Sequence, residues 1–167
     1  MRTFITCAVT LASMVVPAMA TADIEVQFYG DNGDKFVITN ADACPLFDAT
    51  IEIDLSSSSG LLFFDVTTAA PGHGGPTPFS VSQGQDYLED IPQIKDGDKT
   101  IILNIKNFPA EAVLEFFADT DYDNFGAGGQ THSSFSEGAT VSVSGKDSVQ
   151  FDSDGLALAP GHCGIIS

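Results

Sequence analysis

The chain has 167 residues, 43% hydrophobic and 17% charged, and its 23 acidic and 6 basic residues give a net charge of −17. This length suits one domain with a single sizeable core. A field this negative repels nucleic acid and anionic lipid headgroups, which argues against both as partners, and it attracts cations. Acidity also keeps exported proteins soluble, so a purely solvating role for most carboxylates is the alternative.

The first 22 residues have the features of a secretory signal peptide. Arg2 forms a short positive n-region, and residues 4–16 are mostly apolar. Both Ala18-Met-Ala20 and Ala20-Thr-Ala22 fit the small-x-small cleavage pattern. The apolar run is shorter than the roughly 20 residues of a membrane-spanning helix. We expect cleavage after Ala22, a single acidic mature domain over residues 23–167, no transmembrane segment after cleavage, and a secreted or periplasmic location. Without Arg2, 5 basic residues remain against 23 acidic ones, a net charge of −18.

Cleavage would also remove Cys7 and leave Cys44 and Cys163 as the remaining cysteines. An even pair in an oxidising compartment favours one disulfide, and two separate buried thiols are the alternative. In the chain-entropy model, a disulfide that closes a loop of this length stabilises the folded state by roughly 4 to 5 kcal/mol. We therefore predict a disulfide between Cys44 and Cys163 that ties an early segment to the C-terminus.

Alternation of apolar with polar or small side chains dominates the mature sequence and predicts half-buried strands. Turns rich in Gly and Asp separate these segments, and an Asn-Gly pair at residues 32–33 suits the positive φ of a hairpin turn. The pattern predicts an all-β, single-domain antiparallel β-sandwich, immunoglobulin-like, with about eight or nine strands. In chain order, the expected strands are residues 24–28, 35–39, 50–55, 61–64, 79–81, 100–105, 112–118, 140–144 and 148–151.

Three segments are less regular. Residues 107–117 begin with Asn107, a possible N-cap, followed by Pro109 and Glu111. This local pattern is typical of the start of a helix. We expect a strand there, because tertiary context overrides propensity in an all-β chain. Residues 83–90 suggest a short helical turn, and the Pro/Gly-rich residues 71–78 suggest a loop.

Three aspartates at alternate positions, Asp119, Asp121 and Asp123, lead into a Gly-rich segment. Carboxylates this close repel one another, and Ca²⁺ with six to eight oxygen ligands offsets the repulsion. Asn124 and Gln130 replace the turn Gly and the twelfth-position Glu of an EF-hand loop, which argues against an EF-hand. We expect a sandwich-end loop instead, with turn capping by the same residues as the alternative. The candidate Ca²⁺ ligands are Asp119, Asp121, Asp123, Asn124 and Glu137.

Other chemistry-bearing residues give weaker signals. Three short Asp-containing segments have the composition of turns, and cation sites are the second interpretation. They are residues 31–34, 96–98 and 152–155. His73, His132 and His162 lie in Gly/Ser-rich segments, where we expect exposed loop histidines. The chain has no GxSxG, HExxH, CxxC or phosphate-cradling motif, and nothing singles out a catalytic carboxylate pair. We therefore expect a protein that is not an enzyme.

Seven short segments together carry a resemblance to a known group of proteins: residues 36–40, 44–46, 53–55, 60–65, 96–98, 116–123 and 136–141. In these segments the chain resembles small exported bacterial proteins known as aggregation factor core proteins. The resemblance implies a β-sandwich-like exported domain with a poorly defined role, an adhesion label and no catalytic residues. It aligns Asp119 and Asp121 with a recurrent acidic pair at a strand end and favours a strand at residues 113–118. Such proteins often carry two adjacent acids where this chain has Tyr122-Asp123-Asn124.

The sequence thus predicts an exported binding or adhesion module that binds Ca²⁺ near Asp119. The bound ion would order residues 124–138. Its partner would be a cell-surface component, a carbohydrate or a protein. Two alternatives stay open at this point. One is a metal-free structural or interaction domain whose acidity serves solubility, and the other is an unrecognised hydrolase.

Overall fold

The computed structural model describes residues 24–30, 33–67, 78–122 and 131–160. These residues form eleven β-strands and two short 3-10 turns, η1 (Gln85–Tyr87) and η2 (Ser133–Ser136), without an α-helix. None of the elements in the described residues is a helix able to cross a membrane. The strands are β1 (Ile24–Tyr29), β2 (Lys35–Asn40), β3 (Leu46–Asp54), β4 (Leu62–Phe64), β5 (Ser80–Gln83), β6 (Thr100–Phe108), β7 (Val113–Phe117), β8 (Thr120–Tyr122), β9 (Thr140–Val143), β10 (Val149–Gln150) and β11 (Leu156–Ala159).

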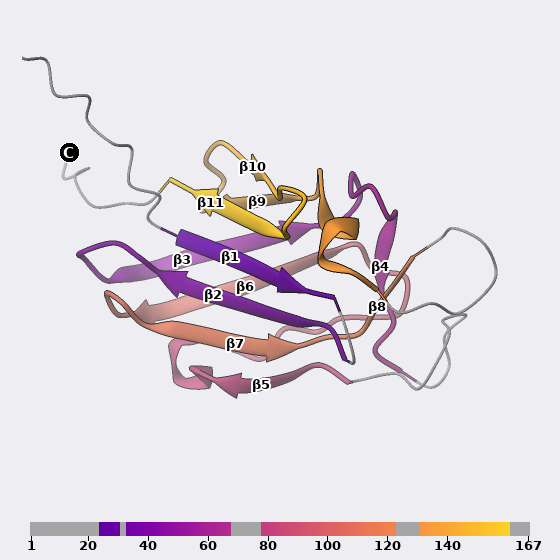
Figure 1. Ribbon diagram of the computed structural model, residues 1–167. Coiled ribbons are helices and arrows are strands. Elements are labelled where there is room, and N and C mark those ends of the chain that lie inside the picture. The colour runs from indigo at the N-terminus through magenta and orange to yellow at the C-terminus, as the bar shows by residue number, and fades with distance from the viewer. Residues whose placement is uncertain (1–23, 31–32, 68–77, 123–130, 161–167) are drawn as a thin grey trace, which may run out of the picture.

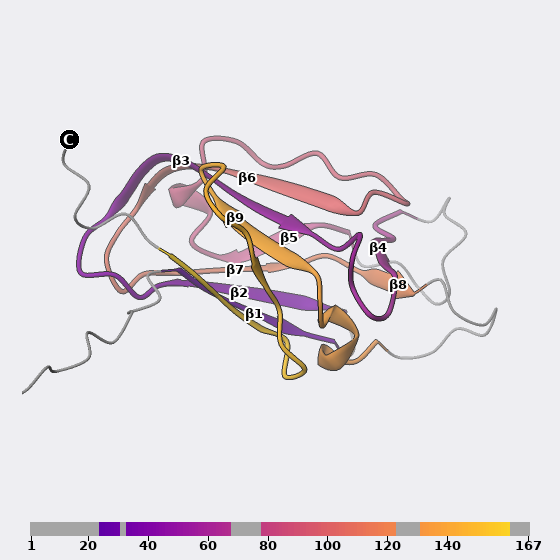
Figure 2. The ribbon, with the colours of Figure 1, turned by 90° about the horizontal axis from the view of Figure 1, so that it is seen from above.

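Two antiparallel sheets lie face to face (Figures 1 and 2), so the predicted all-β sandwich is confirmed. One sheet has the strand order β11-β1-β2-β7-β5, and the other has the order β10-β9-β3-β6. A third pair, β4-β8, forms a small ribbon at one end of the sandwich. In Figure 1 this ribbon lies opposite the end where β1 starts and β11 finishes.

Alternating burial explains why these segments are strands. In β1 and β2 the apolar side chains point inward at every second position, and the residues between them face outward. The core is rich in phenylalanine: the Phe36 ring centroid lies 4.9 Å from that of Phe28, 5.0 Å from Phe116 and 6.3 Å from Phe64. Phe64 belongs to β4, so this aromatic cluster joins a large sheet to the ribbon at the end of the sandwich.

Residues 113–117 form a strand in spite of the helix-like pattern at residues 107–117, because this strand is paired on both of its sides. β7 pairs with β2 and with β5, and Leu114 and Phe116 are buried with the two-residue spacing of a strand. The Pro and Glu instead form a tight turn, in which the Ala112 amide donates to the Pro109 carbonyl at 3.2 Å. The strand expected here is confirmed, and η1 confirms the short helical turn within residues 83–90.

Two strands were not expected. β8 covers Thr120 to Tyr122, so the expectation of a loop throughout residues 119–123 was wrong at these three positions. β11, with the sequence Leu-Ala-Leu-Ala, lacks the β-branched residues that mark strands. With these additions the described strands number eleven, compared with the expected eight or nine.

We predict that Phe36→Ala lowers the free energy of unfolding by about 3–5 kcal/mol, because it leaves a cavity among three other rings. Val37→Thr is the matched control, since Val37 lies one residue along the same strand on the outward face. The control should cost less than about 1 kcal/mol. Urea unfolding followed by circular dichroism measures both values, and similar losses in the two variants would contradict the core assignment.

Candidate functional site

The ribbon of β4 and β8 places three aspartates on one face. Phe63 lies opposite Asp121 in the antiparallel register, and the Asp65 amide donates to the Asp119 carbonyl at 2.9 Å, which continues that register. Asp65 therefore lies opposite Asp119. Because side chains alternate along a strand, Asp65, Asp119 and Asp121 share a face with Phe63. The remaining ribbon residues point to the other face; these are Leu62, Phe64, Thr120 and Tyr122. We call the face that carries the aspartates the acidic face of the ribbon.

Burial makes the acidic face electrostatically unusual. Asp65 is 4% exposed and Asp121 is 7% exposed, whereas Asp119 is half-buried. Directly opposed residues have Cβ atoms about 4.5–5.5 Å apart, where like charges destabilise a strand pair. Removing carboxylates from water adds a desolvation cost. The acidic face thus brings two buried carboxylates and one half-buried carboxylate together at the end of the sandwich.

Asp34 supports the other side of β8. It is 2% exposed, and its Oδ2 accepts hydrogen bonds from the Thr120 amide, at 2.9 Å, and from the Thr120 hydroxyl. The Thr131 hydroxyl donates to the Thr120 carbonyl at 2.8 Å. Thr120 is thereby tied both to the turn between β1 and β2 and to the residue that follows the 123–130 segment. The sequence predicted Asp34 as a turn residue first and as part of a cation site second.

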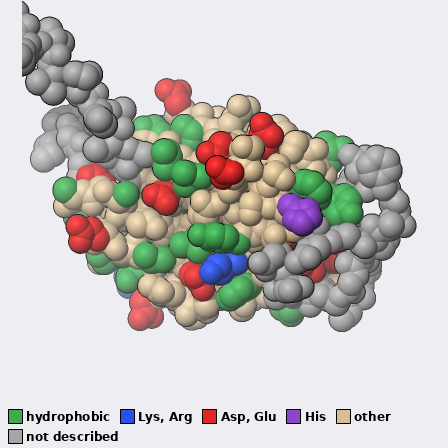
Figure 3. All heavy atoms as spheres, viewed as in Figure 1, with side chains coloured by type: hydrophobic (Ala, Val, Ile, Leu, Met, Phe, Trp, Pro, Cys, Tyr) green, Lys and Arg blue, Asp and Glu red, His purple; other side chains and the backbone are tan. Residues whose placement is uncertain are grey.

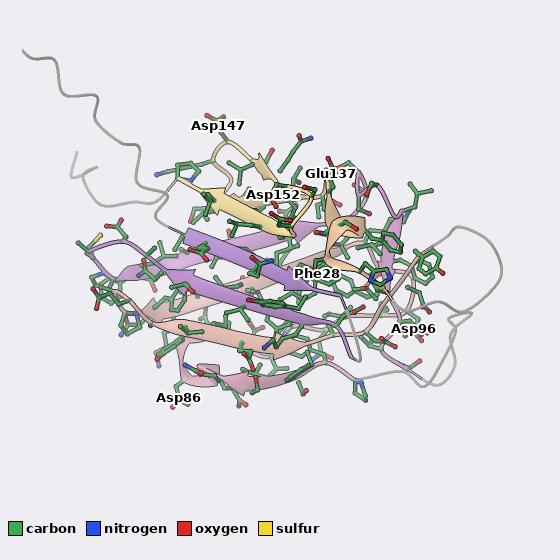
Figure 4. All side chains as sticks on the ribbon, viewed as in Figure 1. Phe28, Asp86, Asp96, Glu137, Asp147 and Asp152 are labelled. Carbon is green, nitrogen blue, oxygen red and sulfur yellow. The ribbon has the colours of Figure 1, made fainter. Side chains whose placement is uncertain are left out.

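A turn at residues 95–99 completes the edge of the ribbon. The Phe64 amide donates to the Asp98 carbonyl and the Gly97 amide donates to the Phe64 carbonyl, each at 2.8 Å. Oδ1 of Asp96 accepts the amides of Val66 and Thr67, and its Oδ2 accepts the Thr67 hydroxyl. The hydrogen bond from the Thr67 hydroxyl is the largest cause that holds the pKa of Asp96 below its ordinary value of 3.8. Desolvation opposes it, and the two amide hydrogen bonds add smaller lowering effects. Figure 4 shows Asp96 at the ribbon end of the molecule.

The predicted ligands are distributed unevenly. Asp119 and Asp121 lie together on the acidic face, joined by Asp65, which the sequence did not indicate. Asp123 and Asn124 lie outside the described residues. Glu137 is exposed, directly follows η2 and is not on the acidic face; its carbonyl accepts the Ser59 amide at 2.7 Å. Within the described ranges, no three or more His, Cys, Asp or Glu side chains form a group able to hold a metal ion.

Other acidic residues have local roles. Oδ1 of Asp152 accepts the amides of Asp154, at 2.9 Å, and Leu156, at 3.0 Å, so residues 152–155 form the turn that their composition suggested. Figure 3 shows carboxylates spread across the visible face of the sandwich instead of gathered in one patch. A depression of about 280 Å³ beside η1 is lined by Gln85, Asp86, Leu88, Glu89, Asp90, Ile91 and Lys106.

The candidate histidines and cysteines are only partly described. His132 is exposed, as expected, and its ring meets the Phe135 ring edge-on at 5.5 Å, whereas His73 and His162 lie outside the described residues. Cys44 follows β2, and Cys163 lies outside the described residues, so their disulfide stays a prediction. In the strand register, Ile24 pairs with Asn40 on one side and with Ala159 on the other. β2 and β11 therefore end at the same end of their sheet.

Comparison with known proteins does not identify the chain. No family model matches it, and neither a curated protein nor a solved structure matches it significantly. The resemblance to aggregation factor core proteins therefore stays a prediction.

We predict that Asp96→Asn destabilises the protein at neutral pH and has a shrinking effect in acid. The folded-state pKa of Asp96 is lowered, so its stabilisation is present above the unfolded-state pKa and is lost as pH falls through the folded-state value. Urea midpoints at pH 7, 5 and 3 should show the difference between wild type and variant closing below about pH 4.

Asp86→Asn provides the control, because it removes the same charge from an exposed residue of η1. It should change the midpoint little at any of the three pH values. A wild-type to Asp96→Asn difference that stays constant from pH 7 to pH 3 would show that the carboxylate's charge is not the cause.

Proposed function

We propose that the protein is an exported acidic β-sandwich that works as a binding or adhesion module and binds Ca²⁺ on the acidic face of the β4-β8 ribbon. The observation that carries the proposal is the placement of Asp65 opposite Asp119, with Asp121 two residues along β8. Two of these three aspartates are almost completely buried. The signal-peptide pattern and the resemblance to exported adhesion-type proteins support an extracellular or periplasmic setting.

The physical case rests on charge. Asp65, Asp119 and Asp121 carry the hard oxygen donors that Ca²⁺ prefers, and backbone carbonyls and water would complete a set of six to eight ligands. As described, the three side chains do not form a group able to hold the ion, so binding would require their carboxylates to turn toward one another. Asp123 and Asn124, the next residues of the predicted series, would extend the set along the chain. A bound ion would neutralise the carboxylates and tie β4 to β8. Its remaining coordination positions would be open to hydroxyl or carboxylate oxygens of a carbohydrate or protein partner.

A metal-free structural or interaction domain is the second candidate, and a specific observation favours it. Asp34, Asp96 and Asp152 each accept a hydrogen bond from at least one backbone amide, so some of the acidic residues serve the fold without a ligand. In that case the acidic face would be maintained by protein contacts, and acidity elsewhere would serve solubility. The two candidates differ in one measurable property, which is whether Ca²⁺ binds to the folded protein at a defined place.

We predict that Ca²⁺ raises the melting temperature of the mature protein at constant ionic strength. Binding to the folded state alone adds about 2.7 kcal/mol of stability at a hundredfold excess of ion over its Kd. Asp65→Asn and Asp121→Asn should each abolish most of this shift, because each removes a charged ligand. Isothermal titration calorimetry should show one site in the wild type and greatly weakened binding in both variants.

The control is Asp147→Asn, which removes the same charge from an exposed residue remote from the ribbon (Figure 4). It should keep the full Ca²⁺ shift. Equal shifts in Asp121→Asn and Asp147→Asn would mean that Ca²⁺ only screens the negative surface. Identical wild-type melting curves with Ca²⁺ and with EDTA would end the metal proposal and leave the metal-free domain.

A further inference from the structure

The depression beside η1 brings residues of both charges next to apolar residues. Its volume is about 280 Å³, which is close to the lower end of the range for small-molecule pockets. Figure 4 shows Asp86 on the side of the molecule away from Asp96 and the ribbon, so the depression is separate from the acidic face. Its lining residues are the acidic Asp86, Glu89 and Asp90, the basic Lys106, the apolar Leu88 and Ile91, and Gln85.

Contacts with β6 hold this lining in place. Leu88 is paired with Ile105 in an antiparallel bridge, and the Glu89 amide donates to the Asn104 carbonyl at 2.8 Å. Nδ2 of Asn104 also donates to Oδ1 of Asp90 at 3.1 Å, which orients one of the carboxylates. The depression is therefore formed before a ligand arrives, and a preorganised site loses less entropy on binding.

The fold does not use most of the charges in the depression. Within the described ranges, Lys106 makes no salt bridge, and the carboxylates of Asp86 and Glu89 accept no hydrogen bond and form no salt bridge. All three residues are exposed. Asp96 and Asp152, by contrast, accept backbone amides. Groups of both signs thus line one depression without neutralising one another, which leaves each of them available to a ligand.

We propose that this depression binds a small organic zwitterion, such as a free α-amino acid with an aliphatic side chain. The Lys106 ammonium group would bind the ligand's carboxylate, and Asp86 or Glu89 would accept hydrogen bonds from its ammonium group. The aliphatic part would contact Leu88 and Ile91, of which Ile91 is 40% exposed. A ligand with only a positive charge would leave Lys106 without a partner, and one with only a negative charge would be repelled by the net charge of −17.

Heteronuclear NMR titrations of the mature protein test the site at constant ionic strength and mildly acidic pH, where α-amino groups are protonated. The probes are leucine, which carries both charges, leucinamide, which carries only the ammonium group, and N-acetylleucine, which carries only the carboxylate. Leucine should shift the backbone signals of residues 85–91 and of Lys106 in a saturable way. Each analogue should bind at least about tenfold more weakly, because it lacks one hydrogen bond between charged groups.

Substitutions of exposed residues separate the contributions of the two charges. Lys106→Gln should remove the preference for leucine over leucinamide, and the double variant Asp86→Asn/Glu89→Gln should remove the preference for leucine over N-acetylleucine. Lys99→Gln is the control, because it removes the same charge as Lys106→Gln from an exposed residue outside the depression. It should change neither preference.

Three results would overturn the proposal. The first is the absence of any leucine-dependent shift in residues 85–91. The second is equal binding of leucine and leucinamide to the wild-type protein, which would mean that the negative surface attracts any ammonium group. The third is an unchanged preference for leucine in Lys106→Gln, since the carboxylate of the ligand would then be bound by another group.

Discussion

The hydrogen bonds between Asp34 and Thr120 are the constraint on which the end of the sandwich depends. They tie the turn between β1 and β2 to β8, and they keep Thr120 on the core side of the ribbon. Alternation along β8 then places Asp119 and Asp121 on the opposite side, where the pairing with β4 adds Asp65. A buried acceptor that serves the fold thus determines where the candidate ligands lie. Thr120 thus links the candidate site to the fold, beside the contact of Phe64 with the aromatic core.

Most of the sheet structure could be predicted from two-residue alternation, because a half-buried strand requires apolar and polar side chains at alternate positions. The helix signature before β7 could be overruled on the same ground, since Leu114 and Phe116 keep the strand period. β8 and β11 could not be found in this way. β8 has only three residues between aspartates, and β11 alternates leucine with alanine instead of apolar with polar residues.

The candidate site was predictable only in part. Asp119 and Asp121 stand out because they are close in sequence, but Asp65 and Asp34 reach the ribbon through strand register and a hairpin turn, which spacing does not reveal. The acidic residues also divide into two groups by physical role. Asp96 and Asp152 satisfy backbone amides at turns, whereas Asp65, Asp119 and Asp121 share a face on which their charges oppose one another.

The most direct test of this account is a crystal structure of the mature protein grown with saturating Ca²⁺, with the ion located by anomalous scattering. We predict one Ca²⁺ on the acidic face, with carboxylate oxygens of Asp65, Asp119 and Asp121 about 2.3–2.6 Å from the ion. An acidic face without an ion at saturating Ca²⁺, with those carboxylates engaged only by protein groups, would contradict it.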